Sequence, residues 1–309
     1  MVTILGIDTS CYTTSVALCD ESGRLLSDKR RLLPVQAGSC GLRQSEALFL
    51  HVQQLSPLLQ AAFAETTGQP AAVAVSARPR PIADSYLPVF RAGLCVAESI
   101  ASALCIPCYF TSHQEGHLAA ALYSLSANWQ QPFLALHLSG GTGELLHVVP
   151  QPAGYQVEII GDTDLPPGQF IDRVGVALGL PFPAGPHLEK LAEEAAGTSF
   201  RLSGSVKDLH ISFSGPEAAA QRAIREGKTP GPEIALAVFD NIAKSLEKVI
   251  RTARRQTGCQ KVLLVGGVAA NQRIRAKLAP LHVHIADPRY AGDNAVGVAL
   301  LGGRMFAQA

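Results

Sequence analysis

Two histidines four residues apart are the clearest candidate for chemistry in this sequence. His113 and His117 lie in the segment His-Gln-Glu-Gly-His, where the residue pattern predicts a helix. Side chains at positions i and i+4 share one face of a helix, so both imidazoles can bind one divalent metal ion. The segment is not the zinc-protease motif, in which Glu directly follows the first His. The alternative is a helix start that carries polar capping residues and no metal.

A metal site needs at least one further protein ligand, and Asp293 is the candidate. It stands beside Asn294 at the expected start of the last helix. Two imidazoles and one carboxylate form a ligand set that suits iron or zinc. An acidic residue at a helix start can also serve only as a cap.

Two glycine pairs predict close approach of the backbone to a ligand. Gly140-Gly141 and Gly266-Gly267 each follow an apolar run that reads as a buried strand. Peptide N–H groups at such turns, or at the start of a following helix, bind phosphate. Ordinary tight turns have the same composition, so either pair alone leaves both interpretations open.

Two acidic residues lie among apolar neighbours. Asp8 ends the buried run that starts at Val2, and Asp172 lies in Phe-Ile-Asp-Arg. An acid placed in this way beside a phosphate can hold a ribose, a metal or a water molecule. The alternatives are a turn cap for Asp8 and a salt bridge with Arg173 for Asp172.

Alternating strand and helix patterns must position these residues, and they indicate an α/β fold. In the first part of the chain, the residue pattern predicts strands at 2–8, 13–19, 24–33, 71–76 and 108–110, and helices at 45–67, 82–104 and from 113. In the second part, it predicts strands at 133–138, 144–149, 155–160, 261–265 and 282–285, and helices at 170–178, 186–196, 215–226, 233–257, 271–278 and 293–306. Three strands joined by turns occur twice, each time followed by helices. This order indicates an internal duplication, with a break near residues 127–132.

Composition restricts the class of protein. The 309 residues are 47% hydrophobic and 17% charged, which is typical of a folded globular chain long enough for two lobes. A net charge of +1 lacks the basic excess of a dedicated nucleic-acid binder. No apolar run reaches about 18 residues and no signal peptide is evident, so we expect a cytoplasmic protein with no membrane partner.

The cysteines do not predict a disulfide framework. There are seven of them, an odd number, and their spacing is irregular. Cys105 and Cys108 have the CxxC spacing, but one such pair without a second is weak evidence for a metal or redox site. The cysteines are at positions 11, 19, 40, 95, 105, 108 and 259.

Taken together and in order, the motifs of this chain resemble those of the TsaD family of tRNA threonylcarbamoyladenosine synthases. The resemblance extends over nearly the whole chain. The matching segments are Gly6-Ile-Asp-Thr-Ser-Cys11, His113-x-x-x-His117, Leu138-Ser-Gly-Gly141, Phe170-Ile-Asp-Arg-Val174, Gly179-Leu-Pro-Phe-Pro-Ala-Gly-Pro186, Ser212-Phe-Ser-Gly215, Gly266-Gly-Val-Ala-Ala-Asn271 and Asp293-Asn-Ala295.

The resemblance implies the actin-like ATPase (ASKHA) fold, with two duplicated lobes, a mixed sheet in each, and a central cleft. We place residues 1–128 with 289–309 in the N-terminal lobe and residues 129–288 in the C-terminal lobe. The implied enzyme is an acyltransferase. It moves a threonylcarbamoyl group from threonylcarbamoyl-adenylate to N6 of the adenosine next to the tRNA anticodon.

The resemblance also implies the site residues. His113, His117 and Asp293 would bind one divalent metal per subunit, Fe²⁺ or Zn²⁺, and Asp8 and Asp172 would be catalytic. The implied partners are an adenine nucleotide, tRNA, a small related lobe protein and an ATPase. The residues that would contact the adenylate are Leu138, Ser139, Gly140, Gly141, Thr142, Asp172, Gly185 and Asn271.

Several loops depart from the family pattern. Tyr12 stands where acids are usual, and Thr142 replaces a histidine. The usual Ala-Gly-Pro-Gly turn is Ala-Arg-Pro-Arg here, which introduces Arg78 and Arg80 as potential contacts to an anion or to a nucleic-acid backbone. These departures leave two alternatives: a paralogue that uses the same nucleotide and metal on another acceptor, and a partner subunit without activity.

Overall fold

The first sheet is built from the N-terminal strands. In this computed structural model, which describes residues 2–10, 12–35, 42–82, 84–197 and 199–309, its strand order is β3-β2-β1-β4-β5. The first three strands pair antiparallel, and β4 and β5 join β1 in parallel. β1 is buried along its whole length, as expected for an apolar strand covered on both faces. The strands are β1 (Thr3–Asp8), β2 (Thr13–Asp20), β3 (Leu25–Leu32), β4 (Ala72–Arg78) and β5 (Cys108–Ser112).

The second sheet repeats this arrangement. Its order is β12-β11-β6-β7-β8, again with a three-stranded antiparallel meander and two parallel strands beside its first strand. The expected duplication, with one mixed sheet in each half, is therefore confirmed. The strands are β6 (Phe133–Leu138), β7 (Gly143–Pro150), β8 (Tyr155–Asp162), β11 (Val262–Val265) and β12 (His284–Ile285).

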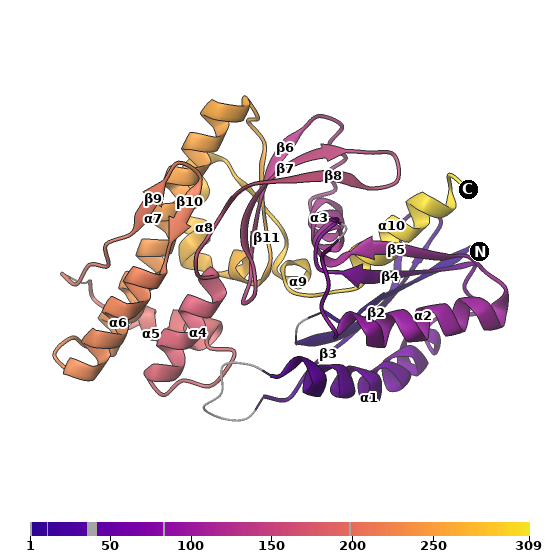
Figure 1. Ribbon diagram of the computed structural model, residues 1–309, viewed down its shortest axis with the longest axis horizontal. Helices are drawn as coiled ribbons and strands as arrows, with labels where there is room; N and C mark the ends of the chain where they lie inside the picture. Colours follow the sequence, from indigo (N-terminus) through magenta and orange to yellow (C-terminus); the bar gives the residue numbers. More distant parts are fainter. Residues whose placement is uncertain (1, 11, 36–41, 83, 198) are drawn as a thin grey trace.

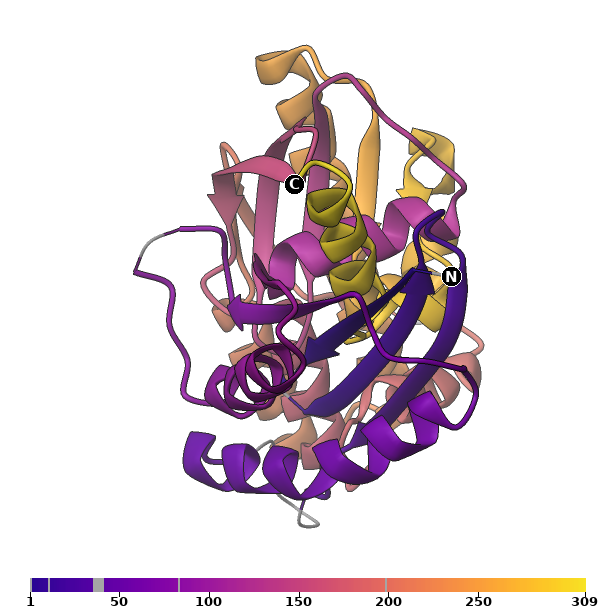
Figure 2. The same cartoon turned by 90° about the vertical axis from the view of Figure 1, so that its right-hand side faces the viewer.

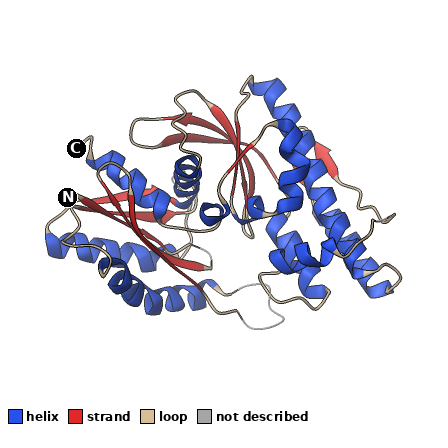
Figure 3. Cartoon of the chain, turned by 180° about the vertical axis from the view of Figure 1, so that it is seen from behind, coloured by secondary structure: helices blue, strands red, loops and turns tan. Residues whose placement is uncertain are grey.

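Helices cover the sheets and lie between them. α1 and α2 lie on one side of the first sheet, whereas α4 to α7 lie on the far side of the second (Figures 1 and 3). α3 lies between the two sheets in both views. The helices are α1 (Gln44–Phe63), α2 (Phe90–Leu104), α3 (His113–Ser124), α4 (Pro167–Ala177), α5 (Gly185–Glu193), α6 (Ser214–Glu226), α7 (Gly231–Thr257), α8 (Gln272–Leu278), α9 (Pro288–Ala291) and α10 (Val296–Phe306), with 3₁₀ turns at Gly267–Ala270 and Ala279–Leu281.

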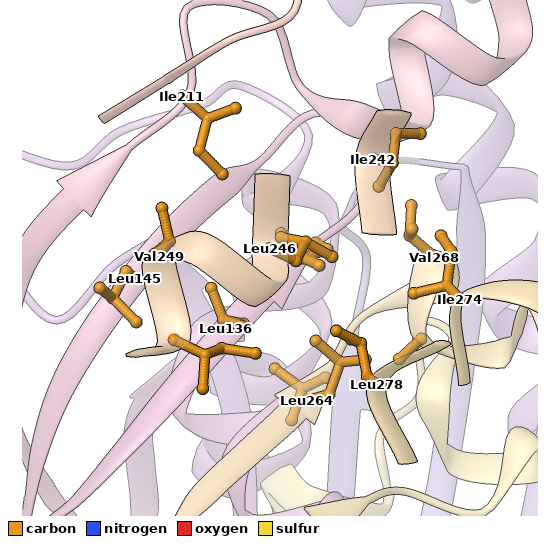
Figure 4. Packing of buried hydrophobic residues seen from close by; sticks show 14 of the residues in the cluster. Leu136, Leu145, Ile211, Ile242, Leu246, Val249, Leu264, Val268, Ile274 and Leu278 are labelled. Carbon is orange, nitrogen blue, oxygen red and sulfur yellow. The ribbon is translucent and has the colours of Figure 1, made fainter. Parts of the chain in front are cut away.

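The larger core lies between the second sheet and α7. Ile242, Leu246 and Val249 on this helix face Leu136 of β6 and Leu264 of β11 (Figure 4). The same buried cluster includes apolar residues of α3, so this helix packs into the second core although it follows a strand of the first sheet. The division of the chain after residue 128 and after residue 288 stays a prediction.

Several predicted elements are wrong in extent. The helix predicted from residue 82 begins at Phe90, because Pro88 disfavours a helical conformation for the residue before it. The last helix begins at Val296 rather than at residue 293, since the Asn294 side chain accepts a hydrogen bond from the Val296 N–H at 3.1 Å. The strand predicted over 282–285 is reduced to β12, because His282 has a positive φ of 50°.

The residue pattern did not predict two short features. A hairpin forms from β9 (Ser205–Lys207) and β10 (His210–Ser212), whose strands are too short to show periodicity. α9 is a single turn that begins after Asp287, whose side chain caps it. Cys11 and Cys40 lie outside the described residues. Among the described residues, no helix is both long enough and apolar enough to span a bilayer.

α10 joins the first sheet to α3. It lies across the N-terminal strands (Figure 2) and packs closely because its residues are small. A Cβ atom added at Gly297 would meet the carbonyl oxygen of Gly116 in α3, and one added at Gly6 of β1 would lie 2.6 Å from the Ala299 nitrogen. These contacts between backbones require glycine, because a larger residue would separate the elements.

We predict that Gly297→Ala destabilises the protein, because its methyl group overlaps the α3 backbone. The free energy of unfolding should fall by about 1–3 kcal/mol, the usual effect of overpacking. Urea unfolding of the purified variant measures this. Gly303→Ala is the matched control in the same helix, since its nearest neighbour would be Ile4 Cγ1 at 3.8 Å. Equal stability of the two variants would contradict the close contact of α10 with α3.

Candidate metal centre and nucleotide cavity

The first turn of α3 presents the two predicted histidines. Ser112 and Glu115 form a capping box: the Ser112 hydroxyl accepts from the Glu115 N–H at 3.2 Å, and Glu115 Oε2 accepts from the Ser112 N–H at 3.0 Å. These two residues therefore supply the polar cap that was the alternative interpretation of the segment. His113 and His117 are not needed as caps, and both are buried.

The structure brings Asp293 to the histidines. His113 Nε2 and His117 Nε2 are 3.0 Å apart. Asp293 Oδ1 lies 3.5 Å from the first and 3.4 Å from the second. Ligand atoms bound to one tetrahedral zinc at about 2.1 Å are separated by about 3.4 Å. The triangle formed by these three atoms therefore has the dimensions of a metal site.

Asp8 holds His113 in place. Its Oδ2 lies 2.8 Å from His113 Nδ1, and its Oδ1 accepts from the Ser10 N–H at 2.7 Å. Burial raises the pKa of Asp8, but the charge and the hydrogen bond of His113 lower it overall. A carboxylate on Nδ1 leaves Nε2 directed towards Asp293, the arrangement typical of histidines that bind metals. The structure thus places Asp8 behind His113.

A third histidine, which the sequence did not predict as a ligand, completes the cluster. His137 of β6 is buried, and its ring centroid lies 4.8 Å from that of His117. The ligand nitrogens of the three histidines all lie within 4.8 Å of one another. Both ring nitrogens of His137 are buried with no hydrogen-bond partner among the described residues, as is Nδ1 of His117. An unpaired buried polar atom costs about 1–3 kcal/mol, so a cation bound to the unprotonated ring nitrogen of His137 would offset part of this cost.

The charges of the cluster are divided between its members. Burial lowers the pKa of His113, but Asp8 and Asp293 raise it to about 10 overall. Burial and the neighbouring His113 lower the pKa of His117. Burial, His117 and His113 lower the pKa of His137. Without a metal, His113 therefore carries the proton while the other two imidazoles stay neutral, the form that binds metals.

A separate cavity of about 230 Å³ lies in the second half of the chain. Four predicted adenylate residues line it: Gly140, Asp172, Gly185 and Asn271. Asp172 accepts a hydrogen bond from the Ala184 N–H at 2.7 Å, and burial raises its pKa. The expected alternative, an ion pair with Arg173, is not seen among the described residues. The floor of the cavity is completed by Gly168, Ile171, Pro183, Pro186, Glu189, Gly267, Val268 and Ala270.

Four other predicted adenylate residues do not line this cavity. Leu138 is fully buried, and its carbonyl lies against Gly266. The Ser139 hydroxyl accepts from the N–H groups of Gly141 at 3.2 Å and Thr142 at 3.0 Å. Two of the expected phosphate donors are therefore already paired within the turn.

Comparisons with known proteins agree with this architecture. A family profile described as "TsaD: tRNA N6-adenosine threonylcarbamoyltransferase" matches residues 40–300. Component A of (R)-2-hydroxyglutaryl-CoA dehydratase from Acidaminococcus fermentans is similar in structure, with a TM-score of 0.62 at 15% identity, covering 99% of this chain and 100% of that one.

Two further solved structures show the same fold. HypF from T. kodakarensis has a TM-score of 0.63 at 15% identity; the match covers 99% of this chain and 48% of that one. A ROK family glucokinase from Streptomyces griseus, in complex with glucose and AMPPNP, has a TM-score of 0.52 at 12% identity and covers 99% and 100% of the two chains. These likenesses confirm the actin-like ATPase (ASKHA) fold.

We predict that His137→Phe has opposite effects on metal-free and metal-loaded protein. Removing two unpaired buried nitrogens should leave the metal-free protein equally stable or about 1 kcal/mol more stable. Metal affinity should fall by about 10–100-fold. Thermal unfolding with and without chelator, combined with metal analysis, measures both effects. A metal-free variant that is clearly less stable, with metal affinity unchanged, would contradict a ligand role for His137.

Asp172 should reduce stability at neutral pH. Its pKa is raised in the folded protein, so the folded state binds the proton more tightly than the unfolded state. This contribution to stability is present below the unfolded pKa and is lost as pH rises through the folded pKa. Asp172→Asn should therefore raise Tm at pH 7, by at most about 2–4 °C, the shift that 1 kcal/mol produces in a protein of similar size. The difference in Tm between Asp172→Asn and the wild type should vanish below pH 4. If the variant has a lower Tm than the wild type at pH 7, the raised pKa of Asp172 is contradicted.

Proposed function

Because the chain belongs to the TsaD family of tRNA N6-adenosine threonylcarbamoyltransferases, we propose that it transfers a threonylcarbamoyl group from threonylcarbamoyl-adenylate to N6 of the adenosine next to the tRNA anticodon. Family membership assigns the chain to tRNA modification of the threonylcarbamoyl type and to the transferases. The observation that carries the finer proposal is the group formed by the buried His113 and His117 and the partly buried Asp293, whose ligand atoms lie 3.0–3.5 Å apart.

The family is metal-dependent, and the residues present fit a metal. His113, His117 and Asp293 would hold one Fe²⁺ or Zn²⁺ per subunit, with His137 as a further imidazole. The fit rests on the 3.0–3.5 Å spacing of His113 Nε2, His117 Nε2 and Asp293 Oδ1. It rests also on His137, whose ring nitrogens are buried with no partner among the described residues. When bound, a divalent cation supplies Lewis acidity and fixes the orientation of acyl oxygens.

Asp8 acts in this proposal by positioning His113. Its carboxylate fixes the ring orientation and keeps Nδ1 engaged, so that Nε2 stays available for the metal. We therefore propose a positioning role for Asp8 in place of the predicted catalytic one, because its side chain is 1% exposed and its carboxylate is engaged by His113 and Ser10.

The 230 Å³ cavity would receive the adenosine part of the donor. Its lining is mostly apolar, with Asp172, Glu189 and Asn271 as polar groups, which is the usual composition of a small-molecule site. Asn271 already uses its side-chain oxygen to cap α8 through the Ile274 N–H at 2.9 Å. Its amide nitrogen would contact the ligand, and Asp172 would accept a hydroxyl hydrogen bond.

The reaction needs no protein nucleophile. The N6 amine attacks the carbonyl carbon of the mixed anhydride and the new N–C bond forms. AMP leaves as the C–O bond breaks, and the amine gives up one proton to water. The chain holds the adenylate at one end and the acyl group at the other, and positioning of this kind accounts for much of the rate of such transfers. By resemblance, we propose that the protein acts in the cytoplasm with a small related lobe protein and an ATPase as partners.

We predict that the protein, assayed together with the two proposed partners, transfers label from isotope-labelled threonylcarbamoyl-adenylate to tRNA. His117→Ala should reduce the rate by roughly 100-fold or more, since loss of a residue that only supports a metal ligand already costs 10–100-fold. His282→Asn is the matched control: it removes an exposed imidazole at a positive φ of 50°, which Asn tolerates. Transfer of the label only to an acceptor other than RNA would refute the proposal.

A further inference from the structure

One ion pair joins the two halves of the chain. Arg80 follows β4 of the first sheet, and Glu144 is the second residue of β7 in the second sheet. Arg80 Nη2 lies 2.5 Å from Glu144 Oε1. The Glu144 side chain is 6% exposed and that of Arg80 is 40% exposed. The carboxylate is therefore buried and depends on its partner, unlike that of a surface pair.

The second oxygen of Glu144 is also paired across the halves. Gln114 Nε2 donates to Glu144 Oε2 at 2.7 Å, and the Gln114 N–H donates to the Pro79 carbonyl at 3.0 Å. The Arg80 N–H donates to the Ser85 hydroxyl at 3.0 Å. Glu144 thus holds the guanidinium of Arg80, and Ser85 holds its backbone N–H.

This arrangement lies beside the three histidines. Glu144 is the direct register partner of His137 on β6, so the two side chains share one face of the sheet. Gln114 follows His113 directly. The positive charge of Arg80 adds to the burial and the neighbouring imidazoles that lower the pKa of His137. Because its side chain is partly exposed, Arg80 is therefore at the rim of the cluster.

The same segment holds a second unused donor. Nε of Arg78, the last residue of β4, is buried and has no hydrogen-bond partner among the described residues. A donor left unpaired in this way is costly unless a ligand supplies an acceptor. Glu144 accounts for only one N–H edge of Arg80, and a guanidinium has five donors.

We propose that Arg80, oriented by Glu144, is a specificity-determining residue that binds an oxyanion of the acyl donor at the rim of the histidine cluster. The inference rests on the proposed function, because threonylcarbamoyl-adenylate carries two such groups, a carboxylate and a phosphate. A planar guanidinium matches either oxyanion with two parallel hydrogen bonds. Arg80 stands where the family resemblance leads one to expect glycine, so this contact distinguishes the chain within its family.

Calorimetric titration with two probes tests this inference. N-carbamoyl-L-threonine carries the carboxylate without a phosphate, and AMP carries the phosphate without the carboxylate. Arg80→Gln should weaken binding of one probe by about 10–100-fold, as expected for loss of a hydrogen bond to a charged group. Arg80→Lys should restore only part of the affinity, because lysine lacks the planar fork. Arg225→Gln on α6 is the matched control, an exposed arginine that should bind both probes like the wild type.

The outcomes separate the two sources of the oxyanion. Weakening of N-carbamoyl-L-threonine alone assigns Arg80 to the acyl carboxylate, and weakening of AMP alone assigns it to the phosphate. If wild type binds neither probe, or if Arg80→Gln binds both as the wild type does, the inference is overturned.

A second variant guards against misfolding. Glu144→Gln keeps an acceptor for Gln114 but removes the ion pair, so it should weaken the same probe by a smaller factor. Unchanged binding by Glu144→Gln would overturn the orienting role of Glu144. The titration measures binding of the probes and not transfer to RNA, so the two proposals can fail separately. If a probe binds through Arg80 but the protein does not modify tRNA, only the proposed function is refuted.

Discussion

The close contact between α10 and α3 is the constraint on which the candidate metal centre depends. Gly297 lies against the backbone of Gly116, which stands between the two histidines of the first turn of α3. Asp293 precedes α10 by three residues, so the helix that packs at this distance also brings the carboxylate to 3.4–3.5 Å from the imidazoles. A wider spacing of the helices would remove Asp293 from the ligand triangle while leaving the His113–His117 pair intact. Gly116 and Gly297 therefore determine whether Asp293 can approach the two histidines.

Much of the fold could be predicted from the sequence, because buried strands and helices of ordinary length leave a periodic pattern. The histidine pair was predictable for the same reason: both members lie on one helix, and spacing alone places them together. His137 was not predictable as a ligand, since it stands in the apolar strand Phe-Leu-Ala-Leu-His-Leu and looks like a core residue. Its partners come from α3, and only tertiary packing brings them to it. A buried polar residue in an otherwise apolar strand is the one signal that could have identified it. The capping role of Asn294 was not predicted, because Asn294 and the candidate ligand Asp293 are adjacent and either of them could cap the helix that follows.

The duplicated topology assigns different tasks to equivalent positions. β1 and β6 are the first strands of the two repeats, and each ends at the turn into its antiparallel partner. In the first half, this turn carries Asp8, which holds a histidine. In the second half, it carries Ser139, whose hydroxyl organises a glycine turn next to the 230 Å³ cavity. Equivalent positions at the ends of β1 and β6 therefore differ in role. The first carries a charged side chain that holds a histidine, and the second carries a hydroxyl that accepts hydrogen bonds from backbone N–H groups. Glu144 and Arg80 connect these halves beside the histidines.

The position of α10 on the first sheet also has a consequence for biosynthesis. β1 to β5 leave the ribosome early, but the face that α10 covers, around Gly6 and Ala74, stays open until residues beyond 290 have been made. N-terminal regions usually fold first during synthesis. Here the first half must wait for the second, which can assemble its sheet and α7 in the meantime. The candidate metal centre, which needs Asp293, is consequently completed late in synthesis. Nascent chains would therefore expose His113, His117 and an apolar sheet face together.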